Sequence, residues 1–127
     1  DAMIAGTDFV LADFGQFWPT VRERAEKWVN DECIEASRGH GYACLCNDDG
    51  MLVVTLKPTV DNRWQAFVQM AVSTGKPGAF KRNEESMLAI ARDMGATSLG
   101  FRADRRGWAR LLGPEWRQSG KWYERGL

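Results

Sequence analysis

The chain has 127 residues, of which 44% are hydrophobic and 27% charged, and this is the composition of one ordinary globular domain. A chain of this length forms a hydrophobic core that needs no disulfide or metal ion for stability, and it is too short for two independent cores. No apolar run approaches the roughly 18 residues that cross a bilayer. We therefore expect one domain over residues 3–127 with no membrane span, and we interpret Asp1 and Ala2 as a remnant of expression.

The net charge of zero hides an asymmetry between the two halves of the chain. Residues 1–75 hold 6 basic and 11 acidic side chains, whereas residues 76–127 hold 11 basic and 6 acidic ones. Two interpretations remain open: the halves attract each other in the fold, or the C-terminal half binds a phosphate-bearing ligand.

The cysteines argue against a disulfide framework and give only weak support for a metal site. Cys33, Cys44 and Cys46 are odd in number and follow no secretory signal, so we expect a reducing, cytoplasmic location. Together with His40, the single histidine, they would make a Cys3His zinc set at irregular spacing. We interpret them as small core residues and expect no metal.

A helix and a hairpin are the first predicted elements. Pro19 suits a first helical turn, and apolar residues then recur at helical spacing until Gly39 and Gly41 end the helix, which predicts one helix over residues 18–37. Its apolar face comprises Val21, Ala25, Trp28, Val29, Cys33 and Ala36. Two β-prone runs, 42–46 and 51–56, flank the turn residues 47–50 and predict a hairpin.

Residues 64–73 fit either a strand or a helix, and we favour the strand. Trp64, Ala66, Val68, Met70 and Val72 alternate as in a strand, although Phe67 and Ala71 also fit a helical face. A loop over residues 75–78 leads to a helix over about 80–94, with Asn83 as its cap or a start nearer Phe80.

The last third predicts a strand, a short helix and a second hairpin. Residues 97–103 alternate as a strand, and Asp104 is a candidate cap for a helix from Arg105 to Leu112. Residues 116–118 and 121–125 then form a final hairpin or a kinked strand. Helices interleaved with strands in one small domain predict an α/β (α+β) fold with a mixed sheet covered on its faces.

Three segments of this order carry a resemblance to a known family. Residues 91–99 place Gly95-Ala96 between a helix and a strand, and residues 107–112 and 120–125 provide a short helix and a closing strand. With the elements before them, they make residues 42–125 resemble the GNAT acyltransferase superfamily, especially small versions encoded by bacteriophages and prophages. The resemblance implies a mostly antiparallel central sheet flanked by helices.

The resemblance also implies an acyl-CoA site, with acetyl-CoA as one candidate cofactor. The cofactor would lie in a V-shaped gap beside residues 64–73, with its pyrophosphate on the N-terminus of the helix at 80–94. Free N–H donors and a partial positive charge favour anions at such a terminus. The predicted cofactor-binding residues are Val72, Ser73, Lys76, Gly78, Lys81 and Arg82. The backbone N–H of Val72 or Ser73 is also the candidate oxyanion donor.

The chain departs from the family in its phosphate loop and in its acid–base groups. Residues 76–83 keep one glycine and place the bulky Phe80 and charged Arg82 near the positions of the others. Residues 64–73 offer Gln65 and Gln69 instead of a glutamate base, and no tyrosine lies near Gly113. Tyr123 is expected to pack with its hydroxyl at the surface. Water relaying a proton to Asp48, Asp49 or Asp61 remains open, and no catalytic residue is assigned.

Three functions follow as hypotheses. The first is an acyl-CoA-dependent N-acyltransferase acting on an unknown amine, and the second is a catalytically inactive phage protein of the same fold that binds a phage or host protein. The third is a nucleic-acid-binding module built from arginines, one lysine and tryptophans. Its candidate residues are Arg102, Arg105, Arg106, Arg110, Arg117, Lys121, Arg125, Trp108, Trp116 and Trp122. With six tryptophans, either a monomer or a homodimer is expected.

Overall fold

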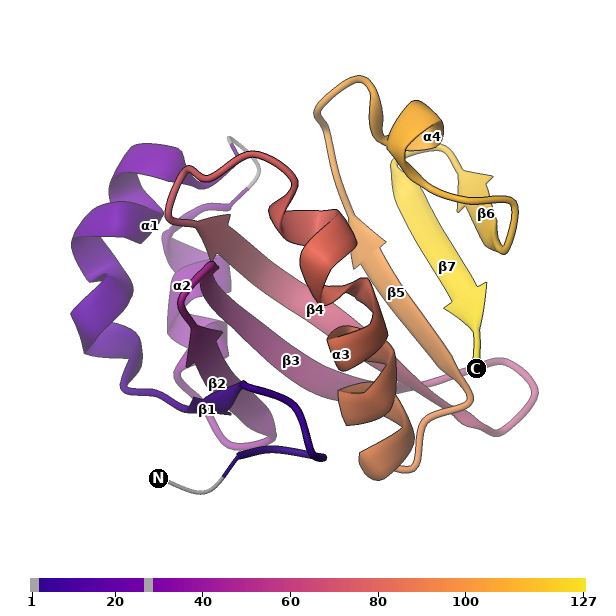
Figure 1. Cartoon of the computed structure of the whole chain (residues 1–127). Coiled ribbons are helices and arrows are strands. Elements are labelled where there is room, and N and C mark those ends of the chain that lie inside the picture. The colour runs from indigo at the N-terminus through magenta and orange to yellow at the C-terminus, as the bar shows by residue number, and fades with distance from the viewer. Residues whose placement is uncertain (1–2, 27–28) are drawn as a thin grey trace.

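A computed structural model describes residues 3–26 and 29–127. It is a mixed α+β fold built on a seven-stranded sheet of order β1-β2-β3-β4-β5-β7-β6 (Figure 1). The strands are β1 (Val10–Leu11), β2 (Tyr42–Asn47), β3 (Gly50–Pro58), β4 (Trp64–Ser73), β5 (Ser98–Arg102), β6 (Trp116–Ser119) and β7 (Trp122–Gly126). The helices are α1 (Trp18–Arg24), α2 (Asp31–Ser37), α3 (Ala79–Asp93) and α4 (Trp108–Leu111), and a 3-10 turn, η1 (Phe14–Phe17), precedes α1.

Helices cover both faces of the sheet, and each face has its own apolar core. α3 connects β4 to its parallel neighbour β5 and packs on one face, where Leu88 is fully buried, while the other neighbouring strands are antiparallel. α1 and α2 cover the β2–β4 part of the opposite face through Val21 and Ile34. Within the described residues, no helix is both long and apolar enough to span a membrane.

Several predicted elements are confirmed. Asn47 pairs with Gly50, so the first hairpin turns at Asp48 and Asp49. Residues 64–73 form a strand, and β6 and β7 form a hairpin that turns at Gly120, whose φ is +61°. The long helix ends before Gly95 as expected.

A bulge divides the strand at 64–73 and corrects its predicted single apolar face. Val54 pairs with Val68 and Val53 pairs with Met70, which leaves Gln69 as an extra residue in β4. One inserted residue reverses the side-chain alternation beyond it. Ala66 and Val68 therefore face α3, whereas Met70 and Val72 face α1 and α2.

The single N-terminal helix predicted over residues 18–37 is wrong, because two helices occupy that stretch. α1 ends where Ala25 takes an extended conformation with a ψ of 149°. The Asn30 side chain then accepts a hydrogen bond of 2.9 Å from the N–H of Cys33, as an N-cap does, and starts α2. The predicted contribution of Trp28 lies outside the described residues. β1 was not predicted, because its two residues are too few to give a periodic pattern.

Both predicted side-chain caps in the C-terminal half are wrong. α3 begins at Ala79 after Gly78, which is left-handed with a φ of +78°. The alternative start nearer Phe80 is therefore confirmed, and Asn83 lies inside the helix. α4 begins after Gly107, with a φ of +99°, and is shorter than predicted. Asp104 forms ion pairs with Arg102 at 3.6 Å and Lys121 at 3.5 Å instead of capping a helix.

Candidate functional site

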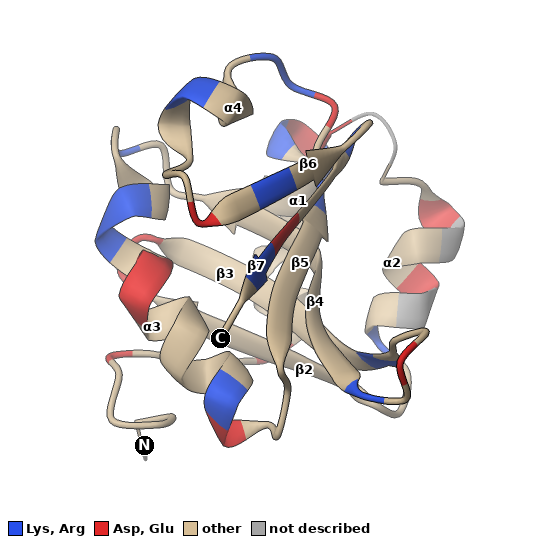
Figure 2. Ribbon diagram, turned by 90° about the vertical axis from the view of Figure 1, so that its right-hand side faces the viewer, with Lys and Arg blue, Asp and Glu red and all other residues tan. Residues whose placement is uncertain are grey.

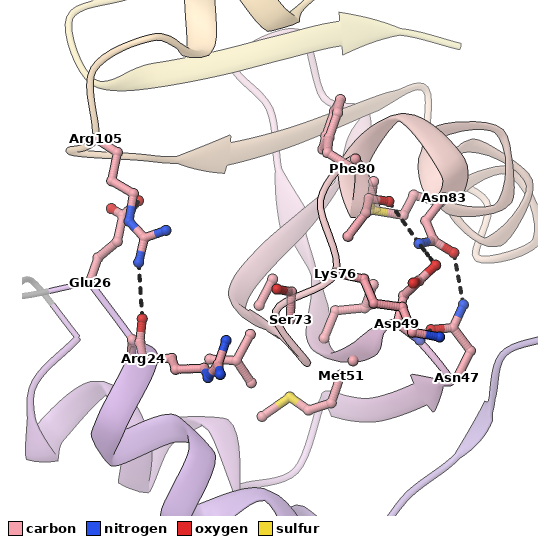
Figure 3. Close-up of a pocket in the computed structure, with 18 of the residues that line it drawn as sticks. Arg24, Glu26, Asn47, Asp49, Met51, Ser73, Lys76, Phe80, Asn83 and Arg105 are labelled. Atoms are coloured by element: carbon pink, nitrogen blue, oxygen red, sulfur yellow. Dashed lines mark hydrogen bonds and ion pairs between the residues drawn. The ribbon is translucent and has the colours of Figure 1, made fainter.

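The main cavity opens where β4 and β5 separate. The two strands pair from Gln65 with Ser98 to Val68 with Phe101, while β4 continues to Ser73. A cavity of about 640 Å³ lies beside this extension (Figure 3). Its walls come from the end of α1, the β2–β3 turn, the start of α3 and the loop between β5 and α4. This volume is in the range of small-molecule sites.

The N-terminus of α3 forms one wall of the cavity. The N–H of Arg82 donates to the carbonyl of Gly78, and the N–H groups of the preceding first turn have no carbonyl within the helix to bond. Gly78 caps the helix through its backbone conformation, and no side chain caps it. Because α3 has 15 residues, its dipole adds a partial positive charge at this end.

Asp49 in the β2–β3 turn holds the start of α3 in place. Its carboxylate accepts hydrogen bonds from Arg82 Nε at 3.0 Å, Arg82 Nη2 at 2.7 Å and Asn83 Nδ2 at 2.9 Å. The Arg82 hydrogen bonds, followed by the Asn83 bond, lower the pKa of Asp49 to about 2. The buried Asn83 also accepts from Asn47 at 2.7 Å, so one polar network joins the turn to the helix.

Four of the six predicted cofactor-binding residues line the cavity and two do not. Val72, Ser73, Lys76 and Gly78 lie in its wall. Lys81 is exposed outside the lining. Arg82 also lies outside it, because its guanidinium binds Asp49 and the carbonyl of Pro77. The Arg82 guanidinium, which we predicted to bind a phosphate, is therefore already neutralised by the Asp49 carboxylate.

The structure adds two cations that the sequence analysis did not select for the cofactor site. Arg24 and Arg105 line the cavity, although 81 positions separate them. Arg105 Nη2 donates to the carbonyl of Arg24 at 3.1 Å (Figure 3). Glu26 accepts a hydrogen bond of 2.7 Å from the N–H of Asp104. These contacts fasten the end of α1 to the β5–α4 loop, and no local sequence pattern signals a contact across that distance.

Phe80 forms part of the wall and does not seal the cavity. Its ring packs on Trp108 at 5.1 Å, on Trp116 at 5.9 Å and on Phe101 at 6.1 Å between centroids. These aromatic neighbours fix Phe80 beside the opening, with Trp108 lining the same cavity.

The candidate acid–base groups are scattered. Asp61 precedes β4 and lies at the opposite end of that strand from Ser73, so it is remote from the cavity. Asp49 lines the cavity, whereas Asp48 does not. Gln65 donates to Glu124 at 2.6 Å on the far face of the sheet. Tyr123 is buried, and its ring is stacked on that of Phe101 at 5.1 Å between centroids, which confirms its predicted packing.

No cluster of three or more histidine, cysteine or acidic side chains with metal-binding geometry occurs among the residues described. Burial, followed by the charges of Cys46 and Asp13, raises the pKa of the Cys44 thiol to about 11. Metal ligation requires the thiolate, so this environment disfavours it at Cys44.

Carboxylates offset much of the positive charge of the C-terminal half. Arg117 pairs with Glu124 at 2.7 Å, and Arg125 pairs with Glu84 at 2.9 Å. The described ion pairs that join the two halves are Arg82 with Asp49 and Arg105 with Glu26. Basic and acidic segments are interspersed along the β6–β7 hairpin (Figure 2). Trp116 is buried and Trp122 half-exposed, so these residues do not form a continuous stacking surface for nucleic acid.

Comparison with known proteins finds no matching family model and no significantly similar curated protein.

Proposed function

We propose that this chain binds an acyl-CoA in the cavity and transfers its acyl group to an amine, as the resemblance to the GNAT acyltransferase superfamily implies. One observation carries the proposal: the cavity opens where β4 leaves β5, and the N-terminus of α3 forms its wall. The free edge of β4 suits the amide groups of a pantetheine arm, and the helix amides suit a diphosphate.

The cavity keeps cations for an anionic ligand without Arg82: Arg24, Lys76 and Arg105 line it beside the carboxylates Glu23, Glu26 and Asp49. Lys76 lies on the loop that enters α3, and the Arg24 guanidinium lies beside Gly75 in the same loop. Arg105 also lines the cavity and pairs with Glu26. A diphosphate on the α3 amides would receive its nearest positive side chain from Lys76. Cations placed in this way form charge-assisted hydrogen bonds with phosphate oxygens.

The proposed transfer needs alignment and oxyanion stabilisation more than a strong base. The amine nitrogen attacks the thioester carbonyl, the C–N bond forms, the C–S bond breaks, and the leaving thiolate takes up the proton that the amine releases. Successive strand N–H groups point to opposite edges, so either Val72 or Ser73 directs its N–H away from β3 toward the developing oxyanion. Asp49, with a pKa of about 2, is a weak base, which leaves Glu23 and Glu26 in the lining to relay a proton through water.

Calorimetry with CoA, 3′-dephospho-CoA and pantetheine tests the proposal. We expect CoA and 3′-dephospho-CoA to bind with affinities within about threefold of each other and pantetheine to bind at least about tenfold more weakly, because the diphosphate is the proposed anchor. Absence of heat from CoA at millimolar concentration would overturn the proposal and leave a scaffold protein.

A matched pair of variants locates the anchor. Lys76→Ala removes a cation from the cavity wall, and Lys81→Ala removes one from the exposed side of α3. Loss of one charged phosphate contact lowers affinity by about tenfold or more, so Lys76→Ala should do so while Lys81→Ala changes it less than about twofold. Equal effects of the two variants would contradict the placement of the diphosphate.

A further inference from the structure

The two sides of the cavity differ in chemistry. Arg24, Lys76 and Arg105 belong to its charged side. Another part of the lining is apolar and comes from segments far apart in the chain: Phe9, Leu52, Phe80, Met87 and Trp108. A diphosphate and an amine account for the charged side, whereas the apolar side matches neither group.

The apolar side reaches into the core between α3 and the sheet. Phe9 is 2% exposed, Leu52 5% and Met87 9%, although all three line the cavity. A second cavity of about 10 Å³ lies beyond Leu52 and Met87 and is lined by further apolar residues of α3 and the sheet, including Ile90 and Val68. Leu52 and Met87 therefore lie at the boundary between the main cavity and the core under the second half of α3.

We infer that the acyl group carried into this site is a hydrophobic chain of medium length and not acetyl, an inference that rests on the proposed function. An acetyl group offers one methyl and would leave the half-buried Phe80 and Trp108 in contact with water. Burying each additional methylene strengthens binding by about fourfold at room temperature. A chain that extends from the free edge of β4 toward Leu52 and Met87 fills the cavity where its lining is apolar.

A series of thioesters tests the inference. Affinities for CoA, acetyl-CoA, butanoyl-CoA and octanoyl-CoA are measured by calorimetry on the full chain, with S-octanoyl-N-acetylcysteamine as a probe that lacks phosphate. We expect affinity to rise along the series, with octanoyl-CoA binding at least about thirtyfold more tightly than acetyl-CoA because part of the chain is buried. Equal affinities for acetyl-CoA and octanoyl-CoA would overturn the inference and leave CoA binding intact.

A variant on the cavity wall tests whether the acyl chain lies on the apolar side. Ala71 pairs with Leu52 across β3 and β4, is exposed, and lines the cavity, so Ala71→Phe places a ring beside Leu52 without disturbing a buried side chain. Ala109 is exposed on α4 outside the lining, and Ala109→Phe is the control. We expect Ala71→Phe to lower octanoyl-CoA affinity by at least about tenfold and to change CoA affinity less than about threefold, and Ala109→Phe to change neither.

The outcomes separate the two proposals. Binding of S-octanoyl-N-acetylcysteamine without binding of CoA would refute the acyl-CoA function but still support the apolar side as a site for the acyl chain. An octanoyl-CoA affinity that Ala71→Phe leaves unchanged would place the chain elsewhere and refute the inference. Failure of every ligand to bind would refute both. A circular dichroism melt of each variant confirms that the comparison is made between folded proteins.

Discussion

Asn83→Ala tests whether the polar network at the start of α3 holds the helix on the sheet. The Asn83 side chain donates to Asp49 at 2.9 Å and to the carbonyl of Ala79 at 2.7 Å, and it accepts from Asn47 at 2.7 Å. A hydrogen bond between neutral groups contributes about 1 kcal/mol and one to a charged group about 2 kcal/mol. The sum of about 4 kcal/mol is an upper value, because the partners near the surface regain water when the amide is removed. We expect a loss of about 2–3 kcal/mol in the free energy of unfolding.

Urea denaturation followed by tryptophan fluorescence measures this loss. Glu85→Ala is the matched control, because Glu85 is exposed on the same helix. Its replacement should change stability by less than about 0.5 kcal/mol. A loss below about 0.5 kcal/mol for Asn83→Ala would refute the view that the network fastens α3 to the β2–β3 turn.

Two further predictions concern the same corner of the fold. The pKa of Asp49 is about 2 in the folded chain and 3.8 in an unperturbed one, so its contribution to stability is present above pH 3.8 and is lost as the pH falls toward 2. Melting temperatures measured from pH 6 to pH 2 should therefore fall more steeply for the parent than for Asp49→Asn, and parallel curves would contradict this. A Cβ at Gly50, where φ is +146°, would lie 2.1 Å from the carbonyl oxygen of Val72. Gly50→Ala should cost at least about 2 kcal/mol of stability in urea, whereas Gly126→Ala, which meets nothing within 4 Å, should cost little; similar values for both would count against the close approach of β3 and β4.

Local signals were sufficient for the elements with strong periodicity or turn chemistry. The Asp48-Asp49 turn and the helix ending before Gly95 depend on contacts between near neighbours, and the structure confirms both. The strand at 64–73, whose pattern also fits a helix, is held by its pairing with β3 and β5. The break between α1 and α2 was not predicted, because the apolar spacing continues through it. The Asn30 side chain starts α2 by accepting a hydrogen bond from the N–H of Cys33, and the apolar spacing alone does not reveal this new helix start.

The site was predicted less completely because tertiary contacts decide which charges face the cavity. Arg82 stands two positions from Phe80 and looks available in the sequence, yet Asp49 from a distant turn binds it with two hydrogen bonds. Arg24 and Arg105 reach the cavity because the end of α1 meets the β5–α4 loop. The net charge of each half of the chain does not show which cations pair with carboxylates and which face the cavity. An attraction between the halves and an anion site would use the same residues.

The bulge at Gln69 explains why the cavity has an open β4 wall. With strict alternation, Met70 and Val72 would face α3 beside Ala66 and Val68, and their bulk would occupy the space beside the first turn of that helix. The extra residue turns both side chains to the opposite core and directs Ala71 and Ser73 to the cavity. The one extra residue in β4 therefore places small side chains on the cavity wall and large side chains in the core behind it. The opening is therefore a consequence of the register of β4, and an acyl chain that lies along it must fit beside the small side chain of Ala71.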